Sequence, residues 1–235
     1  MTNKHYPESL LVDYKLLLNY WPSHITCRPF VVKAIQDWKI NNSKDDIKIL
    51  EIGPGFGEMT EMILKSVSAN MTLVEADKNA LDDLSAKFES FKDKLTMINA
   101  DATVWIKDQP NESFDIFTAS WVIHNFTVAE REVFLKEVAR ILKPGGLFII
   151  FDKVLPDDKT ELETYWQASL DRLSDLDRLG KTDLKNEMIE HEKRDMDPTM
   201  AWYEKDILED MKGINLRESK ILFRDERDVV FSAIK

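Results

Sequence analysis

The chain has 235 residues, of which 43% are apolar, and its formal net charge is −11. This length and apolar content suit one globular domain with an appended segment. The acidic balance argues against nucleic acid and anionic membranes as partners, because both bind basic surfaces.

The cysteine content and the apolar runs of the sequence indicate the cellular compartment of the protein. Cys27 is the single cysteine, so no internal disulfide can form, and we expect it to be a small buried residue. Residues 1–8 lack the apolar core of a secretion signal, and no apolar run is long enough to span a bilayer. We therefore expect a cytoplasmic protein with no membrane partner.

The first 152 residues predict a helical cap followed by alternating strands and helices. Apolar residues recur at helical spacing over 9–38, and Asn41-Asn42-Ser43 predicts a loop. Strands are predicted at the ranges 47–52, 71–74, 95–98, 114–119 and 147–151, with an apolar helical stripe after the first, second and fourth of them. This alternation predicts a doubly wound α/β fold with a parallel, Rossmann-like sheet and helices on both faces.

The pattern changes after residue 152. Residues 157–212 predict three helices and no strand. The ranges 221–223 and 229–234 then predict two strands that form an antiparallel hairpin. This hairpin completes a mostly parallel seven-stranded sheet. The helical insertion leaves the carboxyl end of the fifth strand, where ligands of such sheets bind, so it is interpreted as a lid; packing on the sheet flank is the alternative.

These boundaries predict a single domain in four parts. They are a helical N-terminal cap (1–45), a core (46–152), a helical insertion (153–215) and a C-terminal hairpin (216–235).

Three glycines follow the first predicted strand at every second position, in Glu51-Ile52-Gly53-Pro54-Gly55-Phe56-Gly57. Without side chains the backbone can approach a ligand closely, and the helix that begins near Glu58 presents free N–H groups. A nicotinamide site uses G-x-G-x-x-G, whereas here the third glycine comes one residue early. A purely structural turn is the alternative.

Acidic residues follow the second and third predicted strands. Glu75 ends the second strand, where a carboxylate can accept both hydroxyls of a ribose. Asp77 is its rival, and also suits the N-cap of the next helix. Asp101-Ala102 follows the third strand, where Asp101 likewise fits an N-cap.

Five elements over residues 47–152 resemble the class I S-adenosylmethionine-dependent methyltransferases: the glycine turn, Glu75, Asp101-Ala102, the segment 114–126 and the Lys143-Pro144-Gly145-Gly146 turn. The resemblance implies S-adenosylmethionine as cofactor and S-adenosylhomocysteine as product, with Asp101-Ala102 reading adenine. Pro54 stands where the family often has cysteine. The implied cofactor contacts are Glu51, Gly53, Pro54, Gly55, Gly57, Glu75, Ala76, Asp101, Ala102 and Ser120.

The predicted activity is methyl transfer to a small-molecule acceptor. His124 follows the fourth strand and is the best candidate for a general base, but the first interpretation of this residue is a histidine that packs beside the cofactor and bonds a backbone carbonyl. Candidate acceptor contacts are Tyr14, Tyr20, Trp21 and Asp152. The scattered histidines predict no metal site.

Other functions stay open. The chain could be a non-catalytic S-adenosylmethionine-binding module or, least favoured, a nicotinamide-dependent oxidoreductase. Its insertion weakly resembles enzymes that make carboxy-S-adenosylmethionine for tRNA modification, but Lys181 stands where those enzymes carry a tyrosine. A nucleic-acid methyltransferase is disfavoured by the charge and by Ser120-Trp121-Val122-Ile123, which replaces the expected Asn/Asp-Pro-Pro-Tyr/Phe motif. The oligomeric state is open, and a homodimer is among the options.

Overall fold

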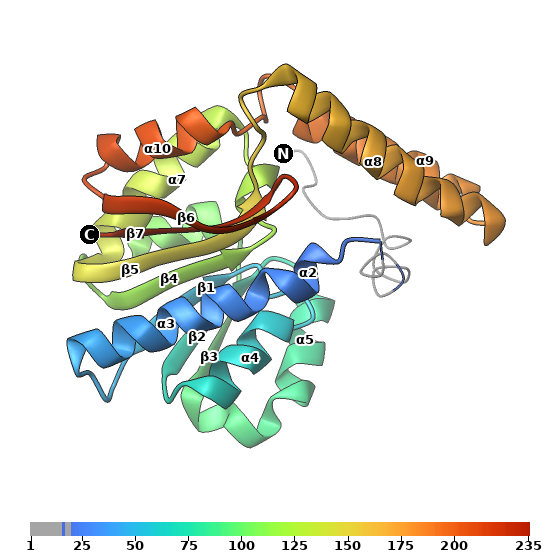
Figure 1. Cartoon of the computed structure of the whole chain (residues 1–235). Helices are drawn as coiled ribbons and strands as arrows, with labels where there is room; N and C mark the ends of the chain where they lie inside the picture. Colours follow the sequence, from blue (N-terminus) through green and yellow to red (C-terminus); the bar gives the residue numbers. More distant parts are fainter. Residues whose placement is uncertain (1–15, 17–19) are drawn as a thin grey trace.

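The computed structural model describes residue 16 and residues 20–235. Its centre is a seven-stranded sheet in the order β3-β2-β1-β4-β5-β7-β6 (Figure 1). The strands are β1 (Lys48–Ile52), β2 (Asn70–Glu75), β3 (Leu95–Asn99), β4 (Phe114–Ser120), β5 (Leu142–Lys153), β6 (Arg217–Asp225) and β7 (Asp228–Ile234). The first five run parallel, and β7 runs antiparallel to both β5 and β6. The predicted fold class is confirmed.

Helices cover both faces of the sheet. They are α2 (Ser23–Thr26), α3 (Arg28–Asn42), α4 (Glu58–Ser66), α5 (Lys78–Lys87), α6 (Ala102–Trp105), α7 (Val128–Ile141), α8 (Lys159–Arg178), α9 (Thr182–Asp195) and α10 (Glu204–Gly213), with 3-10 turns η1 (Glu89–Lys94), η2 (Ile106–Asp108) and η3 (Ile123–Asn125). Helices α3 and α4 lie on one face, and α7 and α10 lie on the other (Figure 1).

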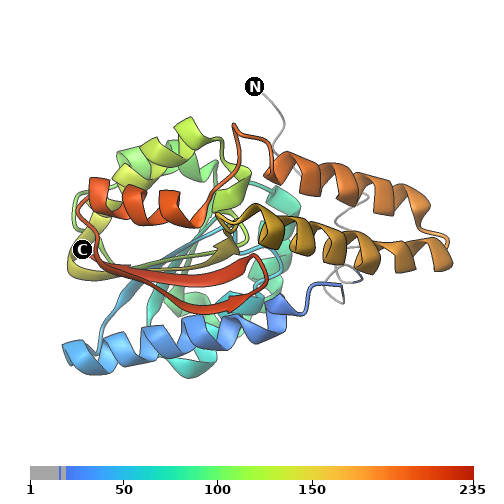
Figure 2. The ribbon, with the colours of Figure 1, turned by 45° about the horizontal axis from the view of Figure 1, so that its top comes forward.

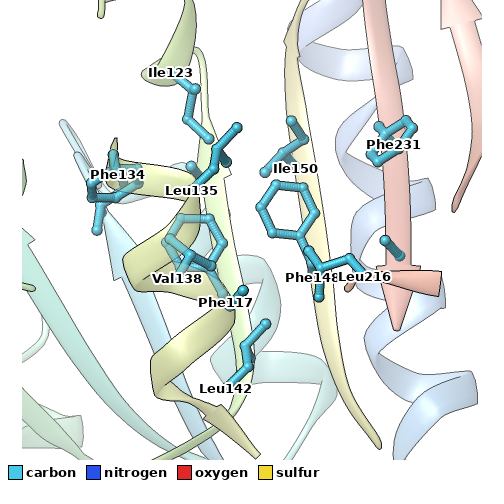
Figure 3. Packing of buried hydrophobic residues seen from close by; sticks show 14 of the residues in the cluster. Phe117, Ile123, Phe134, Leu135, Val138, Leu142, Phe148, Ile150, Leu216 and Phe231 are labelled. Carbon is cyan, nitrogen blue, oxygen red and sulfur yellow. The ribbon is translucent and has the colours of Figure 1, made fainter. Parts of the chain in front are cut away.

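The core follows from the two-residue period of the strands, which sends successive side chains to opposite faces. Phe117 and Phe148 point toward α7, where they meet Phe134 and Val138 (Figure 3). Their neighbours along the strands, such as Ile149, pack toward α3 and α4 on the opposite face. Each fully buried side chain of this kind contributes about 2 kcal/mol to the free energy of folding, so the central strands are the most firmly held part of the chain.

The insertion divides into two parts with different roles. Helix α10 joins the main core through Ile207 and Met211 and is a packing element of the sheet face. Helices α8 and α9 form a hairpin that projects from the sheet (Figures 1 and 2) and has its own apolar cluster around Leu173, Leu184 and Trp21. The lid interpretation therefore applies to α8 and α9 at most.

Some element boundaries differ from prediction. Helix α3 continues through Asn41 and ends at Asn42, and its C-cap is Ser43, which has a positive φ of 49°. Strand β5 begins at Leu142 because this residue pairs with Phe114, before a register shift that accommodates the Pro144-Gly145 turn. Within the described part of the chain, no helix combines the length and the apolar character that crossing a membrane requires.

Candidate functional site

The sheet reverses its winding direction between β1 and β4. From β1 the chain proceeds outward through β2 to β3, then returns to place β4 on the other side of β1. In open α/β sheets ligands bind in the crevice outside the carboxyl ends of the strands at such a switch point. Here these ends lead into Gly53 and Ser120, so the predicted cofactor residues lie at the expected edge.

The three glycines of the turn have different surroundings. A Cβ atom on Gly53 would lie 2.5 Å from the Val122 side chain, and one on Gly57 would lie 2.5 Å from Leu84. Both positions therefore exclude side chains because of internal packing. Gly55 has a φ of +55° and nothing within 4 Å of its would-be Cβ atom. Gly55 is thus the glycine whose open side suits close approach by a ligand.

Glu75 connects the end of β2 to the glycine turn. Its Oε2 accepts a hydrogen bond from the Gly55 amide at 3.2 Å, and its Oε1 accepts one from the Asp77 amide at 3.0 Å. A carboxylate has about four lone-pair positions, so these bonds leave room for two hydroxyl donors. The rival Asp77 accepts from the Asn79 and Ala80 amides as the N-cap of α5, which favours Glu75 as the ribose acceptor.

Glu51 lies one residue before the turn but is buried. It is 1% exposed, and its Oε2 accepts a hydrogen bond from the Thr60 hydroxyl at 2.7 Å. Burial raises the pKa of Glu51 to about 7, partly offset by the Thr60 hydrogen bond and by Arg28. The carboxyl therefore ties β1 to α4.

The end of β3 carries the residues predicted to read adenine. Asp101 is exposed and its Oδ1 accepts from both the amide and the hydroxyl of Thr103, so it is the N-cap of α6. Ala102 begins that helix, and exposed Ala76 accepts a hydrogen bond from the Asn99 amide group. These residues lie beside Glu75 because β2 and β3 are paired in register there.

A histidine–aspartate pair lies after β4. His124 Nδ1 is 2.5 Å from Asp152 Oδ1, and Asp152 Oδ2 accepts from the Ile123 amide at 2.7 Å. His124 is 3% exposed, and its Nε2 is buried without a hydrogen-bond partner anywhere in the described chain. The nearby Ser120 Oγ is also buried and unpartnered within residues 20–235. Asp152 was predicted as an acceptor contact, and the structure instead makes it the partner of His124.

The aromatic residues predicted to contact the acceptor are not brought together. Tyr14 lies outside the described residues. Tyr20 is half-buried against the α8–α9 hairpin, and Trp21 is 3% exposed within the same apolar cluster, edge-on to Trp121 at 6.0 Å between ring centroids. Trp21 is thus a core residue of the hairpin.

Sequence reasoning missed Arg28, which lies at the start of α3 near the glycine turn. Its Nη2 is 2.9 Å from His24 Nδ1 and 3.9 Å from Glu58 Oε2, and its side chain is 11% exposed. Its Nε is buried without a hydrogen-bond partner among the described residues. The four-residue spacing of His24 and Arg28 was the available signal.

The groups at this edge fit S-adenosylmethionine. Gly55 offers an open backbone, Glu75 offers acceptors for ribose hydroxyls, and Arg28 offers a donor suited to a carboxylate. Residues 50–150 match the family model described as "Methyltransferase domain". These residues form a class I methyltransferase domain.

Relatives of this methyltransferase domain carry different names. A carboxy-S-adenosyl-L-methionine synthase of Colwellia psychrerythraea is 29% identical over 49% of this chain and 48% of its own length. An uncharacterized methyltransferase of Bacillus subtilis is 29% identical over 47% of this chain and 42% of its own. The chain thus spans about half or less of these curated relatives.

Solved structures agree with the methyltransferase fold. The DszA carbon methyltransferase has a TM-score of 0.63 at 14% identity, over 88% of this chain and 53% of its own. A structure described as PigF with S-adenosylhomocysteine has a TM-score of 0.56 at 16% identity, over 80% of this chain and 50% of its own. At such identities the likeness shows the fold, and the cofactor of the family is S-adenosylmethionine.

Proposed function

We propose that this protein transfers a methyl group from S-adenosylmethionine to a small-molecule acceptor. The observation that carries the proposal is the open Gly55 backbone, bridged to the Glu75 carboxylate at the switch point of a methyltransferase domain. In this arrangement Glu75 accepts the ribose hydroxyls, Asp101-Ala102 lies against adenine, and Arg28 meets the methionine carboxylate. The four parts predicted from the sequence then form one domain around this site.

When bound, S-adenosylmethionine supplies a methyl group on a positively charged sulfur. The sulfur–carbon bond breaks with its electron pair staying on sulfur, the acceptor forms the new bond to carbon, and the acceptor loses a proton. The protein therefore has to position the acceptor, exclude water and activate the acceptor where its proton is not acidic.

His124 is the residue we assign to activating the acceptor. Asp152 fixes the ring through Nδ1, which leaves the Nε2 lone pair as its reactive side. Val122, two residues earlier, packs against Gly53, so this segment adjoins the glycine turn. We expect His124→Gln to keep cofactor affinity within about twofold and to reduce methyl transfer by about 100-fold or more, as removal of an activating group does.

Carboxy-S-adenosylmethionine synthesis is the second candidate, favoured by the relative from Colwellia psychrerythraea. The basic residues of the insertion do not support it. Arg178 ends α8, on a side chain that is 82% exposed and paired with Asp175, and α8 runs away from the sheet (Figure 1). A position so far along the projecting helix does not suit contact with the cofactor.

The test is calorimetric titration of S-adenosylmethionine and S-adenosylhomocysteine into the wild type and two isosteric variants, with chelator present. We expect Glu75→Gln to weaken binding at least tenfold because it removes the charged acceptor of the ribose hydroxyls. Asp77→Asn is the matched control, since asparagine caps a helix as well as aspartate, and should stay within about twofold. Radiolabelled methyl transfer to phenol, thiol and β-keto thioester acceptors then tests turnover.

Each outcome has one meaning. Absence of binding to folded wild type would overturn the proposal. A larger loss in Asp77→Asn than in Glu75→Gln would move the ribose site to Asp77. Binding without transfer to any acceptor would leave a cofactor-binding module in place of an enzyme.

A further inference from the structure

A second group of polar side chains lies between the sheet and the projecting hairpin. His124 comes from η3, after β4, while His191 and Asp195 lie four residues apart on α9. One ligand atom from each of the three side chains lies within 4.8 Å of the other two. Sequence spacing hides this group, because 67 residues separate the two histidines and the third member is an aspartate.

Two of the three side chains are buried with an unused acceptor. His124 Nε2 and Asp195 Oδ1 have no hydrogen-bond partner in the described part of the chain, although the side chains are 3% and 4% exposed. A buried acceptor without a donor costs about 1–3 kcal/mol. A cation bound between the two side chains would satisfy both acceptors at once.

The His124–Asp152 contact gives independent support. Histidines that bind metals through one ring nitrogen nearly always donate the other N–H to a carboxylate or carbonyl. Asp152 Oδ1 lies 2.5 Å from His124 Nδ1, and Asp152 Oδ2 accepts a hydrogen bond from the Ile123 amide at 2.7 Å. This orientation leaves the Nε2 lone pair for a ligand.

The surrounding charge is compatible with a cation. Three buried carboxylates, Asp152, Glu192 and Asp195, face two buried cations, Lys153 and Arg227. Lys153 Nζ donates to Oδ2 of Asp195 at 2.6 Å, whereas Oδ1 accepts no hydrogen bond from the described residues and lies 3.7 Å from His191 Nδ1 and 3.9 Å from Arg194 Nη2. The buried groups thus include one more carboxylate than cations, and the half-exposed Arg194, 3.9 Å from Asp195 Oδ1, supplies the balancing positive charge.

We propose that His124, His191 and Asp195 bind a divalent transition-metal ion that ties helix α9 to the end of β4. Two imidazoles and one carboxylate are ligands of Zn²⁺, Co²⁺ and Fe²⁺, whereas Mg²⁺ and Ca²⁺ prefer all-oxygen sites. Bonds of about 2.0–2.2 Å place tetrahedral ligands roughly 3.4 Å apart, so the three side chains must close by about 1 Å. Small side-chain rotations suffice for this.

One cation competes for the site. Arg194 Nη2 lies 2.8 Å from His191 Nδ1 and also donates to Asn125 Oδ1 at 2.8 Å. Its side chain is 51% exposed, so it can leave His191 while keeping Asn125. Removing this positive charge is therefore expected to raise metal affinity.

Three protein ligands leave a further coordination position, as in catalytic zinc sites. An acceptor oxygen bound there would lose its proton more readily, so in the metal-bound protein the ion would activate the acceptor and His124 would hold the ion. This last step depends on the proposed methyl transfer, whereas metal binding does not.

The experiment titrates Co²⁺ and Zn²⁺ into chelator-treated full-length protein, following the visible absorption of bound Co²⁺ and the heat of Zn²⁺ binding. We expect one ion per chain in the wild type, with affinity at least tenfold weaker in His191→Gln and Asp195→Asn. Arg194→Gln should bind more tightly. The matched control is Glu190→Gln, which changes an exposed side chain on the same helix. This variant should bind the metal ions with the affinity of the wild type. Circular dichroism verifies that every variant is folded.

Failure of this inference is separable from failure of the proposed function. Less than a tenth of an equivalent of either ion bound to folded wild type would overturn the metal site. Equal affinity in wild type, His191→Gln and Asp195→Asn would also overturn it, because the ion would then bind elsewhere. Cofactor binding measured with chelator present tests the methyltransferase proposal alone.

Discussion

The glycine turn shows how similar backbone angles can serve different purposes. Gly55 and Gly57 both have positive φ, +55° and +74°, but Gly55 borders open space and Gly57 borders Leu84 and Phe88. Alanine at either position adds about 1–2 kcal/mol of backbone strain. At Gly57 the Cβ atom of alanine would also lie only 2.5–2.6 Å from the side chains of Leu84 and Phe88, which would have to move. Gly57→Ala should therefore lower the free energy of unfolding by several kcal/mol in total.

We therefore predict opposite patterns for the two alanine variants. Gly55→Ala should lose about 1–2 kcal/mol of unfolding free energy and bind S-adenosylmethionine at least tenfold more weakly. Gly57→Ala should lose more unfolding free energy, measured by urea denaturation. Where this variant still folds, its loss of cofactor affinity should be smaller than that of Gly55→Ala. Normal cofactor affinity in Gly55→Ala would contradict the assignment of Gly55 as the ligand-facing glycine.

Glu51 makes stability depend on pH. Burial raises the pKa of Glu51 to about 7 from its ordinary value of 4.5, so between these pH values the folded state holds a proton that the unfolded chain releases. Its contribution is fully present below about pH 4.5 and is lost as the pH rises through about 7. The shift corresponds to about 3 kcal/mol.

The measurement is the difference in unfolding free energy between wild type and Glu51→Gln from pH 5 to pH 8. Groups other than Glu51 cancel in this difference. The wild type should lose stability relative to the variant, by about 2.5 kcal/mol over this range. A pH-independent difference would show that Glu51 has an ordinary pKa.

Residue roles were predictable where local spacing determines them. The Glu75 position and the caps at Asp77 and Asp101 all follow from short stretches of sequence. His124 and Asp152 were both singled out, but not as partners, and His191 and Asp195 were not singled out. The four side chains come from η3, β5 and α9, which only the sheet order and the α8–α9 hairpin bring together.

At the scale of elements, buried ion pairs fasten helix α9 to the sheet. Lys153, at the end of β5, donates to Glu192 at 2.9 Å and to Asp195 at 2.6 Å, and Arg227, in the β6–β7 turn, also pairs with Glu192. Lys153 is 3% exposed. Because charged groups are costly to bury unpaired, the orientation of the hairpin depends on this lysine.

We predict that Lys153→Met destabilises the protein by about 3 kcal/mol or more, because buried Asp195 loses its hydrogen-bonded cation and Glu192 keeps only Arg227. Lys193→Met is the control on the same helix. Lys193 is 54% exposed and pairs with Glu190, so its loss should cost less than about 0.5 kcal/mol. Equal effects in urea denaturation would contradict a fastening role for Lys153.

Element order was predictable and the roles of the inserted helices were not. Alternating apolar strands and helical stripes predicted the sheet, the insertion and the hairpin, since each depends on local periodicity. That α10 packs on the sheet while α8 and α9 project depends on tertiary contacts: Ile207 and Met211 meet the main core, whereas Leu173 and Leu184 meet Trp21. The apolar stripes of the three helices look alike in the sequence.

At the scale of the whole molecule, the cofactor edge and the hairpin are joined through a few residues after β4. Val122 packs on Gly53, and His124 lies against α9. The central strands run beneath both regions and carry most of the buried apolar side chains. A ligand at the glycine turn should therefore stabilise the whole chain against unfolding.

This coupling gives a quantitative prediction. A ligand at 100 times its dissociation constant adds about 2.7 kcal/mol to the free energy of unfolding. For a chain of this size each kcal/mol raises Tm by about 2–4 °C, so S-adenosylmethionine should raise Tm by about 5–11 °C. In Glu75→Gln, with tenfold weaker affinity, the same concentration should add only about 1.4 kcal/mol. Differential scanning calorimetry measures both shifts. Equal shifts would show that Glu75 does not hold the cofactor, and an unchanged Tm in the wild type would show that the cofactor does not bind at all.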